Sequence, residues 1–347
     1  MMDCDIAYYE YYDCQTITQV QVLNDNGEIE ECNYYLYTRK NGELDESTPV
    51  IVYVTHGGGV ADVERVYALE QGAKLDTQAI FIAPQTDYPP AVCTCIEDAR
   101  VRLRGLGNFD AVSAHGTSSG GRAIMRAALE SVEDGRDYHF RFANIFAYDP
   151  AAESKGVSIM TNTRGLYRLA KQGTVFIIQT DTDVNATFGG SAWHCNRYAR
   201  IYSLYGGKAI VAQAGSLTHE YLYLEPIQSN SLNWSVGRGS MTEDQYYHNK
   251  WFYYDMGEKI PASFGEVTAI VQESLRNGDN AAGEAPAAEV PIAAKEPAST
   301  REPPAAEVPI AAEEPTPVEE PAPTEEPTTT EEPVGQRTVI RIRRAAS

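Results

Sequence analysis

The sequence predicts an α/β fold with a mostly parallel twisted sheet and helices on both faces, followed by a disordered carboxyl-terminal tail. Two observations carry this prediction. Short apolar runs typical of buried strands alternate with segments of helical spacing between residues 49 and 214. After residue 279 the composition changes to Ala, Pro, Glu, Thr and Val, without an aromatic residue. Such a segment buries too little apolar surface to offset its chain entropy.

The amino-terminal half of the predicted fold begins with two paired strands, at residues 18–24 and 32–39, separated by an Asn-Gly turn. The nearly continuous apolar runs that follow predict strands buried on both faces, at residues 49–56 and 79–84. Helical spacing predicts one helix after each of these runs, at residues 63–74 and 95–107. Glycine is expected to close the second helix.

The same alternation continues in the second half of the chain. Strands are predicted at residues 109–115, 142–149, 174–180 and 208–214. Helices are predicted between them, at residues 121–132, 164–173 and 191–206. In open sheets of this kind ligands bind beyond the carboxyl ends of the strands. The loops at that edge are therefore the place to look for functional residues.

Composition divides the chain into three predicted segments: an α/β domain at residues 1–279, a Pro/Ala/Glu/Thr-rich disordered spacer at 280–336, and a basic peptide at 337–347. The spacer contains a near-duplicate, PAAEVPIAAKEP and PAAEVPIAAEEP. The net charge of −21 includes thirteen Glu and two cations in the spacer and four Arg in the peptide, so the folded segment remains acidic. This charge argues against nucleic acid and anionic membranes as partners.

The basic peptide has two open interpretations. It is either a frayed terminus, or a docking peptide for a protein partner that the spacer holds at a distance. The amino terminus lacks the basic start and apolar core of a signal peptide, and no apolar run approaches the length of a membrane span. We therefore expect a cytoplasmic protein, or one incorporated into a larger assembly.

The cysteines are expected to be reduced thiols rather than a disulfide framework. They are spread through the folded segment, as Cys4, Cys14, Cys32, Cys93, Cys95 and Cys195. Cys93 and Cys95 have the wrong spacing for the usual zinc pairs. No metal site is therefore predicted.

One loop at the predicted carboxyl edge contains a G-x-S-x-G motif, Gly116-Thr117-Ser118-Ser119-Gly120. It lies between a predicted strand and a predicted helix, which is the setting of a nucleophile elbow with Ser118 at its apex. A phosphate-binding P-loop would need a lysine, and a dinucleotide fingerprint a different glycine spacing. A plain structural turn remains an alternative.

A second loop contains His56-Gly57-Gly58-Gly59, directly after the strand predicted at residues 49–56. Glycines let backbone N–H groups approach a bound atom without a Cβ in the way. An oxyanion requires such donors, held in place before its charge develops. The alternative interpretation is a flexible glycine turn.

The HGGG and G-x-S-x-G-G motifs together resemble those of the α/β-hydrolase fold, and within it the hormone-sensitive-lipase-like carboxylesterases, over residues 49–221. The resemblance implies a triad in the chain order Ser, acid, His. It assigns the nucleophile to Ser118, the acid to Asp183 with Asp181 as the alternative, and the base to His219. It also implies an oxyanion hole from the N–H groups of Gly57, Gly58 and Ser119, without a metal or cofactor.

Other candidates fit these roles less well. Asp149 follows an earlier strand from which some lipases take their acid, and His248 is the rival base. His56 belongs to the glycine loop, and His115 is expected to pack or to form hydrogen bonds near the turn. His139 falls between elements and His194 within a helix.

The chain departs from these esterases in lacking room for an amino-terminal cap. An aromatic segment follows His219 instead, with Trp234, Tyr246, Tyr247, Trp251 and Tyr253. It is either a wall that stacks on sugar or aryl substrates, or a peripheral helix that packs its rings on the sheet. The expected function is a carboxylesterase for small acyl, aryl or carbohydrate esters. A serine peptidase, an acyltransferase, and a non-catalytic assembly protein tethered by its tail are the alternatives.

Overall fold

The structure is a computed structural model that describes residues 11–24, 26–56, 65, 68–69, 72–73, 78–148, 150, 162–180, 192–214, 232, 234–237 and 249–276. All of them belong to the first of two units, Met1–Pro286 and Ala287–Ser347, into which the chain divides. The predicted spacer and basic peptide therefore lie outside the described residues, and the predicted domain boundaries stay predictions.

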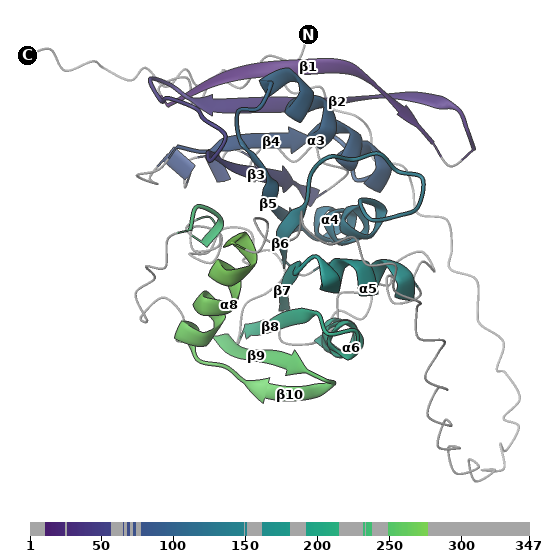
Figure 1. Cartoon of the computed structure of the whole chain (residues 1–347), viewed down its shortest axis with the longest axis vertical. Coiled ribbons are helices and arrows are strands. Elements are labelled where there is room, and N and C mark those ends of the chain that lie inside the picture. The colour runs from purple at the N-terminus through teal and green to yellow at the C-terminus, as the bar shows by residue number, and fades with distance from the viewer. Residues whose placement is uncertain are drawn as a thin grey trace, which may run out of the picture. The chain divides into compact units, whose positions relative to one another are not determined.

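The described strands form a single sheet in the order β1-β2-β4-β3-β5-β6-β7-β8-β9-β10 (Figure 1). Their bounds are β1 Tyr12–Leu23, β2 Ile29–Arg39, β3 Pro49–Val54, β4 Ile80–Pro84, β5 Asn108–Thr117, β6 Phe142–Tyr148, β7 Val175–Thr180, β8 Lys208–Ala214, β9 Asn249–Asp255 and β10 Glu258–Pro261. From β4 to β8 neighbouring strands are parallel, and the pairs at both margins are antiparallel. The carboxyl ends of the six central strands therefore share one edge.

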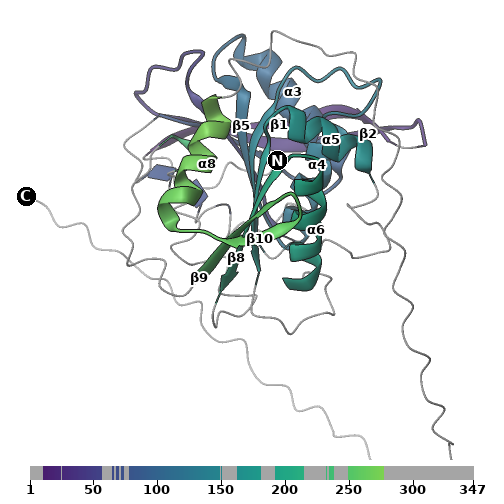
Figure 2. The same ribbon diagram turned by 60° about the horizontal axis from the view of Figure 1, so that its bottom comes forward.

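Helices cover both faces of this sheet, which confirms the predicted fold class. α3 (Pro89–Leu103), α4 (Ser119–Glu130), α5 (Thr163–Lys171) and α6 (Ala192–Leu204) lie on one face, and α8 (Phe264–Arg276) lies on the other (Figure 2). The larger part of the core fills the face under α3 to α6. A second cluster, around Phe146 and Trp234, packs under α8.

Among the predicted boundaries that differ from the structure, the two ends of α3 differ for local reasons. α3 begins at Pro89 rather than at residue 95, because proline fits the first helical turn, where an N–H has no partner in its own helix. The residue that ends α3 is Arg104, in the left-handed conformation at φ 52° and ψ 47°, and not a glycine. Gly105 follows with φ +91°.

The aromatic segment near the carboxyl end is the largest departure from the predicted elements. Trp251 and Tyr253 lie in β9, which adds to the sheet beside β8, and not in a peripheral helix. Trp234 and Trp251 are 0% and 7% exposed and pack in the core under α8. They therefore form no substrate wall. Tyr246 and Tyr247 lie outside the described residues.

The cysteines agree with the prediction in part. Cys32, Cys93, Cys95 and Cys195 are buried free thiols. Cys14, in β1, is disulfide-bonded to a partner outside the described residues, so the prediction of reduced thiols is wrong for Cys14.

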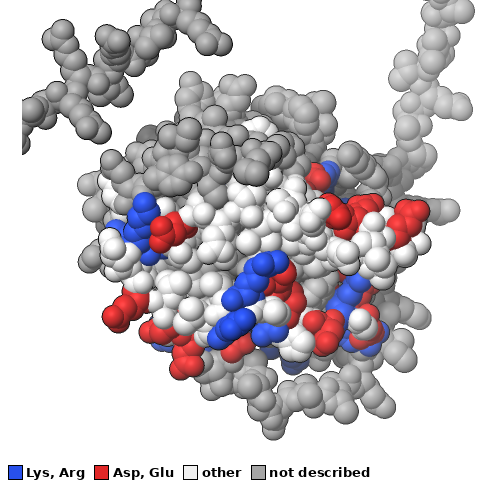
Figure 3. Space-filling view, turned by 90° about the horizontal axis from the view of Figure 1, so that it is seen from above, with Lys and Arg blue, Asp and Glu red and all other residues white. Residues whose placement is uncertain are grey.

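Charged side chains on the face drawn in Figure 3 lie interspersed, with basic groups beside acidic ones. Arg100 with Glu97 and Arg102 with Asp98 are such neighbours on α3. Among the described helices, none is long and apolar enough to cross a membrane.

Candidate functional site at the turn between β5 and α4

Ser118 occupies a sharp turn between β5 and α4. Its backbone has φ 49° and ψ −114°, a conformation that a residue with a Cβ adopts only at a cost of about 1–3 kcal/mol. Two backbone hydrogen bonds hold it there. The Ser118 N–H donates to the Tyr148 carbonyl at 2.9 Å, and the Arg122 N–H donates to the Ser118 carbonyl at 3.1 Å. The strain is thus maintained by β6 on one side and by α4 on the other.

The glycines around Ser118 are required by close backbone contacts. A Cβ on Gly116 would lie 2.5 Å from the Gly120 carbonyl oxygen, and one on Gly121 would lie 3.0 Å from the Gly116 carbonyl oxygen. The end of β5 and the start of α4 are therefore in van der Waals contact with each other. The structure thus confirms that residues flanking the serine must be small.

Gly120 brings the start of α4 against the end of β3. A Cβ at this position would overlap the Val54 carbonyl oxygen and lie 2.6 Å from that of Thr55. Thr55 is followed directly by His56 and by the predicted oxyanion loop. The described chain therefore reaches His56 beside the amino terminus of α4, and Gly57 and Gly58 lie outside the described residues.

The two serines of the turn are half-buried, between the buried Thr117 and Gly120. The Ser118 side chain makes no capping hydrogen bond to α4. Ser119 is the first residue of α4, and N–H groups of a first helical turn point out of the helix along its axis. The helix dipole adds partial positive charge at the same end. This end of α4 therefore favours negative charge next to Ser118.

His115 lies in β5, three residues before Ser118, and is fully buried. Its Nδ1 lies 3.2 Å from the Tyr148 hydroxyl and its Nε2 lies 2.8 Å from Ser235 Oγ. The ring also stacks between Tyr53 and Phe146. Burial lowers the pKa of His115 to about 3, so the imidazole is neutral at physiological pH. The structure confirms the predicted packing and hydrogen-bonding role.

The remaining members of the implied triad, Asp183 (or Asp181) and His219, lie outside the described residues. The strands that precede them are described. β7 ends at Thr180, next to β6, and β8 ends at Ala214, next to β7. Both strands are parallel to β5, so they end at the edge of the sheet at which Ser118 lies. Asp149 and His248, the weaker candidates, are also outside the described residues.

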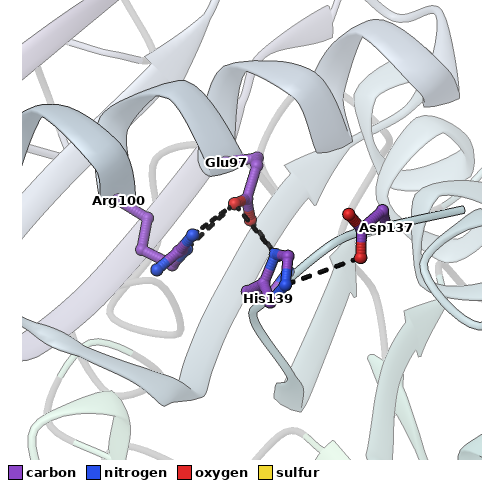
Figure 4. A network of polar contacts seen from close by, with 4 residues as sticks. All are labelled: Glu97, Arg100, Asp137 and His139. Carbon is purple, nitrogen blue, oxygen red and sulfur yellow. Dashed lines mark hydrogen bonds and ion pairs between the residues drawn. The ribbon is translucent and has the colours of Figure 1, made fainter.

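Three further histidines belong to the described residues. His139 precedes β6 and contacts Glu97 on α3 and Asp137, at 3.3 and 3.5 Å (Figure 4). His194 lies in α6, as predicted, and His56 is exposed at the end of β3. Within the part of the chain that the structure describes, no group of His, Cys, Asp and Glu side chains is arranged to hold a metal ion.

The carboxyl end of β7 contains polar groups that sequence reasoning missed. Gln179 is 2% exposed, and neither atom of its amide has a hydrogen-bond partner in the described structure. Thr180 Oγ1 is likewise unsatisfied. In the register of the sheet Gln179 pairs with Tyr148, which pairs with Thr117. Thr117 directly precedes Ser118, so the register places this row at the border of the candidate site. A single Gln in an apolar strand was the available signal.

The strand order and the strained serine turn after β5 make this an α/β-hydrolase-type fold. No family model and no curated protein matches the chain. Several esterases are among the solved structures to which the chain is similar. A thermostable esterase from Pseudomonas putida is 13% identical, with a TM-score of 0.45 over 68% of this chain and 83% of that one. The enterobactin and salmochelin hydrolase IroE is 13% identical, with a TM-score of 0.46 over 65% and 96%.

Brefeldin A esterase, a bacterial homologue of human hormone-sensitive lipase, is a third similar structure. It is 13% identical, with a TM-score of 0.43 over 68% of this chain and 79% of that one. These likenesses concern the fold alone. An assignment of function has to rest on the residues of this chain.

Proposed function

We propose that the protein is a serine hydrolase of the carboxylesterase type, with Ser118 as its nucleophile. The observation that carries the proposal is the strained backbone of Ser118 at the carboxyl edge of a parallel sheet, enclosed by glycines that accept no Cβ. A structural turn has no need of a half-buried hydroxyl in this conformation. A nucleophile does, because the turn lifts its Oγ off both strand and helix.

The proposed reaction proceeds through an acyl-enzyme. His219 removes the proton of Ser118 Oγ as the oxygen attacks the ester carbonyl, and then donates that proton to the departing alcohol. A water molecule, deprotonated by His219, attacks the acyl-enzyme, and Ser118 recovers its proton as the acid leaves. Asp183, or alternatively Asp181, orients the imidazole and stabilises its cationic form.

The oxyanion formed in each step would be held by the N–H groups of Gly57, Gly58 and Ser119. Two features of the described residues support this assignment. Ser119 begins α4, where N–H groups and the helix dipole favour negative charge. Gly120 packs on Val54 and Thr55, which precede the glycine loop in the sequence, so the described chain approaches that loop beside the same helix terminus. Removal of one such donor typically lowers kcat by about 10²–10³-fold.

We propose small acyl, aryl or carbohydrate esters as the substrate class. Long-chain lipids are left out of this class, because Trp234 and Trp251 are buried in the core and are not available to a long acyl chain. No metal or organic cofactor enters the proposed reaction. A screen of p-nitrophenyl acyl esters beside acetylated and feruloylated glycans tests the class.

The nucleophile is tested with a fluorophosphonate probe on the full chain. The wild-type protein is expected to be labelled once, at Ser118, and Ser118→Ala is expected to abolish labelling. Ser119→Ala is the matched control, since it removes a neighbouring hydroxyl but leaves the backbone N–H, and it should still be labelled. Absence of labelling in folded wild-type protein would refute the proposal and favour a non-catalytic role.

Amide and transfer substrates separate the remaining alternatives. A carboxylesterase should cleave a p-nitrophenyl ester far faster than the anilide with the same acyl group. Equal rates would indicate a peptidase. Preferential formation of a new ester when an alcohol is added, at the expense of the free acid, would indicate an acyltransferase.

A further inference from the structure

Away from the candidate active site, two cysteine sulfurs are in contact. Cys32 lies in β2 and Cys95 lies in α3, and their Sγ atoms are 3.3 Å apart. Both are free thiols, and they are separated by 63 residues in the chain. Formation of a disulfide would require the sulfurs to approach by only about 1.3 Å, to the usual bond length near 2.05 Å.

We propose that Cys32 and Cys95 form a disulfide site that cross-links β2 to α3 when the protein meets a low-molecular-weight disulfide. This site is separate from Ser118 and does not depend on the proposed hydrolase function. Contact between the two sulfurs, their different secondary-structure elements and an adjacent groove each support it.

A groove lies next to the pair, lined by neighbours of Cys32 and Cys95 but not by the two cysteines themselves. It has a volume of about 370 Å³ and lies between β1 and α3. Its lining includes Val20, which is paired with Cys32 across the strands, and Thr94 and Asp98, which flank Cys95 on α3. Cys32 is 8% exposed and Cys95 is fully buried. Cys32 is therefore the sulfur that an external disulfide reaches first.

A β-bulge in β1 interrupts its pairing with β2 next to Cys32. The pairing shifts between Ile17 and Val20, and Gln19 in the bulge has a positive φ of 61°. The Gln19 N–H donates to Asn33 Oδ1 at 3.2 Å and so leaves the regular ladder. Gln19 also lines the groove. The bulge therefore interrupts the regular ladder directly before the Val20–Cys32 pair, at the edge of the groove.

The electrostatics of the pair favour the same order of events. The hydrogen bond between the two sulfurs lowers the pKa of Cys32, and the same bond, followed by burial, raises the pKa of Cys95. Of the two thiols, Cys32 therefore loses its proton first, and Cys95 retains its proton to higher pH. Thiolates, not thiols, attack disulfides.

The proposed exchange balances in two steps. The Cys32 thiolate attacks a sulfur of the external disulfide, which forms a mixed disulfide and releases one thiolate. Cys95 then loses its proton and attacks the Cys32 sulfur, which forms the Cys32–Cys95 bond and releases the second thiolate. Two protein thiols are oxidised, and one external disulfide is reduced to two thiols.

Cys93 provides a matched control within the same helix. It is two residues from Cys95 and equally buried, but its Sγ–H donates to the Ala127 carbonyl of α4 at 3.2 Å. Burial raises the pKa of Cys93 well above its usual value. It therefore faces away from Cys32 and should take no part in the exchange.

The test treats the full-length protein with hydroxyethyl disulfide, alkylates the remaining thiols in denaturant and maps the peptides by mass spectrometry. We expect a peptide pair linked through Cys32 and Cys95, 2 Da lighter than the two separate thiol peptides, with Cys93 alkylated. The existing disulfide at Cys14 is the internal standard for retained oxidation. Recovery of Cys32 and Cys95 as alkylated thiols, a stable mixed disulfide at Cys32, or a link to Cys93 would each overturn the proposal.

A stability measurement provides an independent readout. Oxidation should raise the Tm of the wild-type protein and of Cys93→Ser by roughly 5–15 °C, because the bond closes a loop of about 60 residues. Cys32→Ser should show no such rise. If Cys32→Ser does not fold, Cys95→Ala takes its place. An equal rise in the variant without the pair would refute the cross-link.

Discussion

The two ends of β5 carry two left-handed turns with opposite surroundings. At the amino end, Arg104 has φ 52° and is followed by Gly105, beside which a Cβ would meet open space. At the carboxyl end, Ser118 has φ 49°, and the glycines beside it leave no room for a Cβ. A positive φ thus occurs once where the neighbouring glycine has free space around it and once where the neighbouring glycines are tightly packed.

This difference shows how the fold retains strain at the candidate site. The turn at Arg104 is a helix cap, a local solution that many residues could adopt. The turn at Ser118 is imposed by β3, β6 and α4 together, so it cannot relax without moving the sheet. Strained conformations persist only where the surroundings over-determine them, and they concentrate at functional sites.

The largest expected effect separates the glycines of the two turns. Gly120→Ala would force a Cβ into the end of β3 and is expected to destabilise the protein by more than about 4 kcal/mol or to prevent folding. Gly105→Ala should cost only about 1 kcal/mol, for its positive φ. Urea unfolding and probe labelling measure both. A folded, labelled Gly120→Ala protein would contradict the described packing.

A second difference concerns ionisable groups. Asp110, near the amino end of β5, is exposed, whereas His115, near the carboxyl end, is buried with a pKa of about 3. Between pH 6.5 and 3 the unfolded chain binds a proton on His115 that the folded chain does not. Stability is therefore expected to fall as pH falls through this window, by about 1.4 kcal/mol per unit and about 2–3 kcal/mol at pH 4.5.

His115→Gln removes this titration while an amide remains to meet Tyr148 and Ser235. The difference in unfolding free energy between pH 7 and pH 4.5 should shrink by about 2–3 kcal/mol in the variant. An unchanged difference would mean that the His115 imidazole titrates normally in the folded protein.

A smaller effect distinguishes strain from chemistry at Ser118. Ser118→Gly is expected to abolish probe labelling and to raise stability by about 1 kcal/mol, because glycine adopts a positive φ without penalty. Ser118→Ala should also abolish labelling but leave stability within about 0.5 kcal/mol, since it retains the Cβ. Equal stability of the two variants would show that the turn stores no strain.

The smallest effect is expected at the permissive turn. Arg104→Gly should stabilise the protein by about 0.5 kcal/mol, since the gain at the left-handed position is partly offset by the greater freedom of glycine in the unfolded chain. Labelling at Ser118 should be unchanged. A loss of labelling would mean that the two ends of β5 are coupled and would remove the basis of the comparison.

Much of the fold followed from local pattern. The runs at residues 49–56 and 79–84 are apolar at successive positions, as expected of a central strand that is buried on both faces. In the structure they form β3 and β4. The aromatic segment that contains Trp251 has no clear period, so its addition as β9 could not be seen. Pairing with β8, and not the propensity of the segment, decided it.

The sequence by itself determined the alternation of strands and helices and the position of the serine turn, because Gly116, Ser118 and Gly120 are contiguous and their steric demands are local. Only the tertiary structure decided that His115 is neutral, that Trp234 and Trp251 belong to the core, and that Cys32 meets Cys95. Burial and contacts between residues far apart in the sequence depend on how helices and strands pack. The local sequence pattern therefore does not predict which distant residues meet.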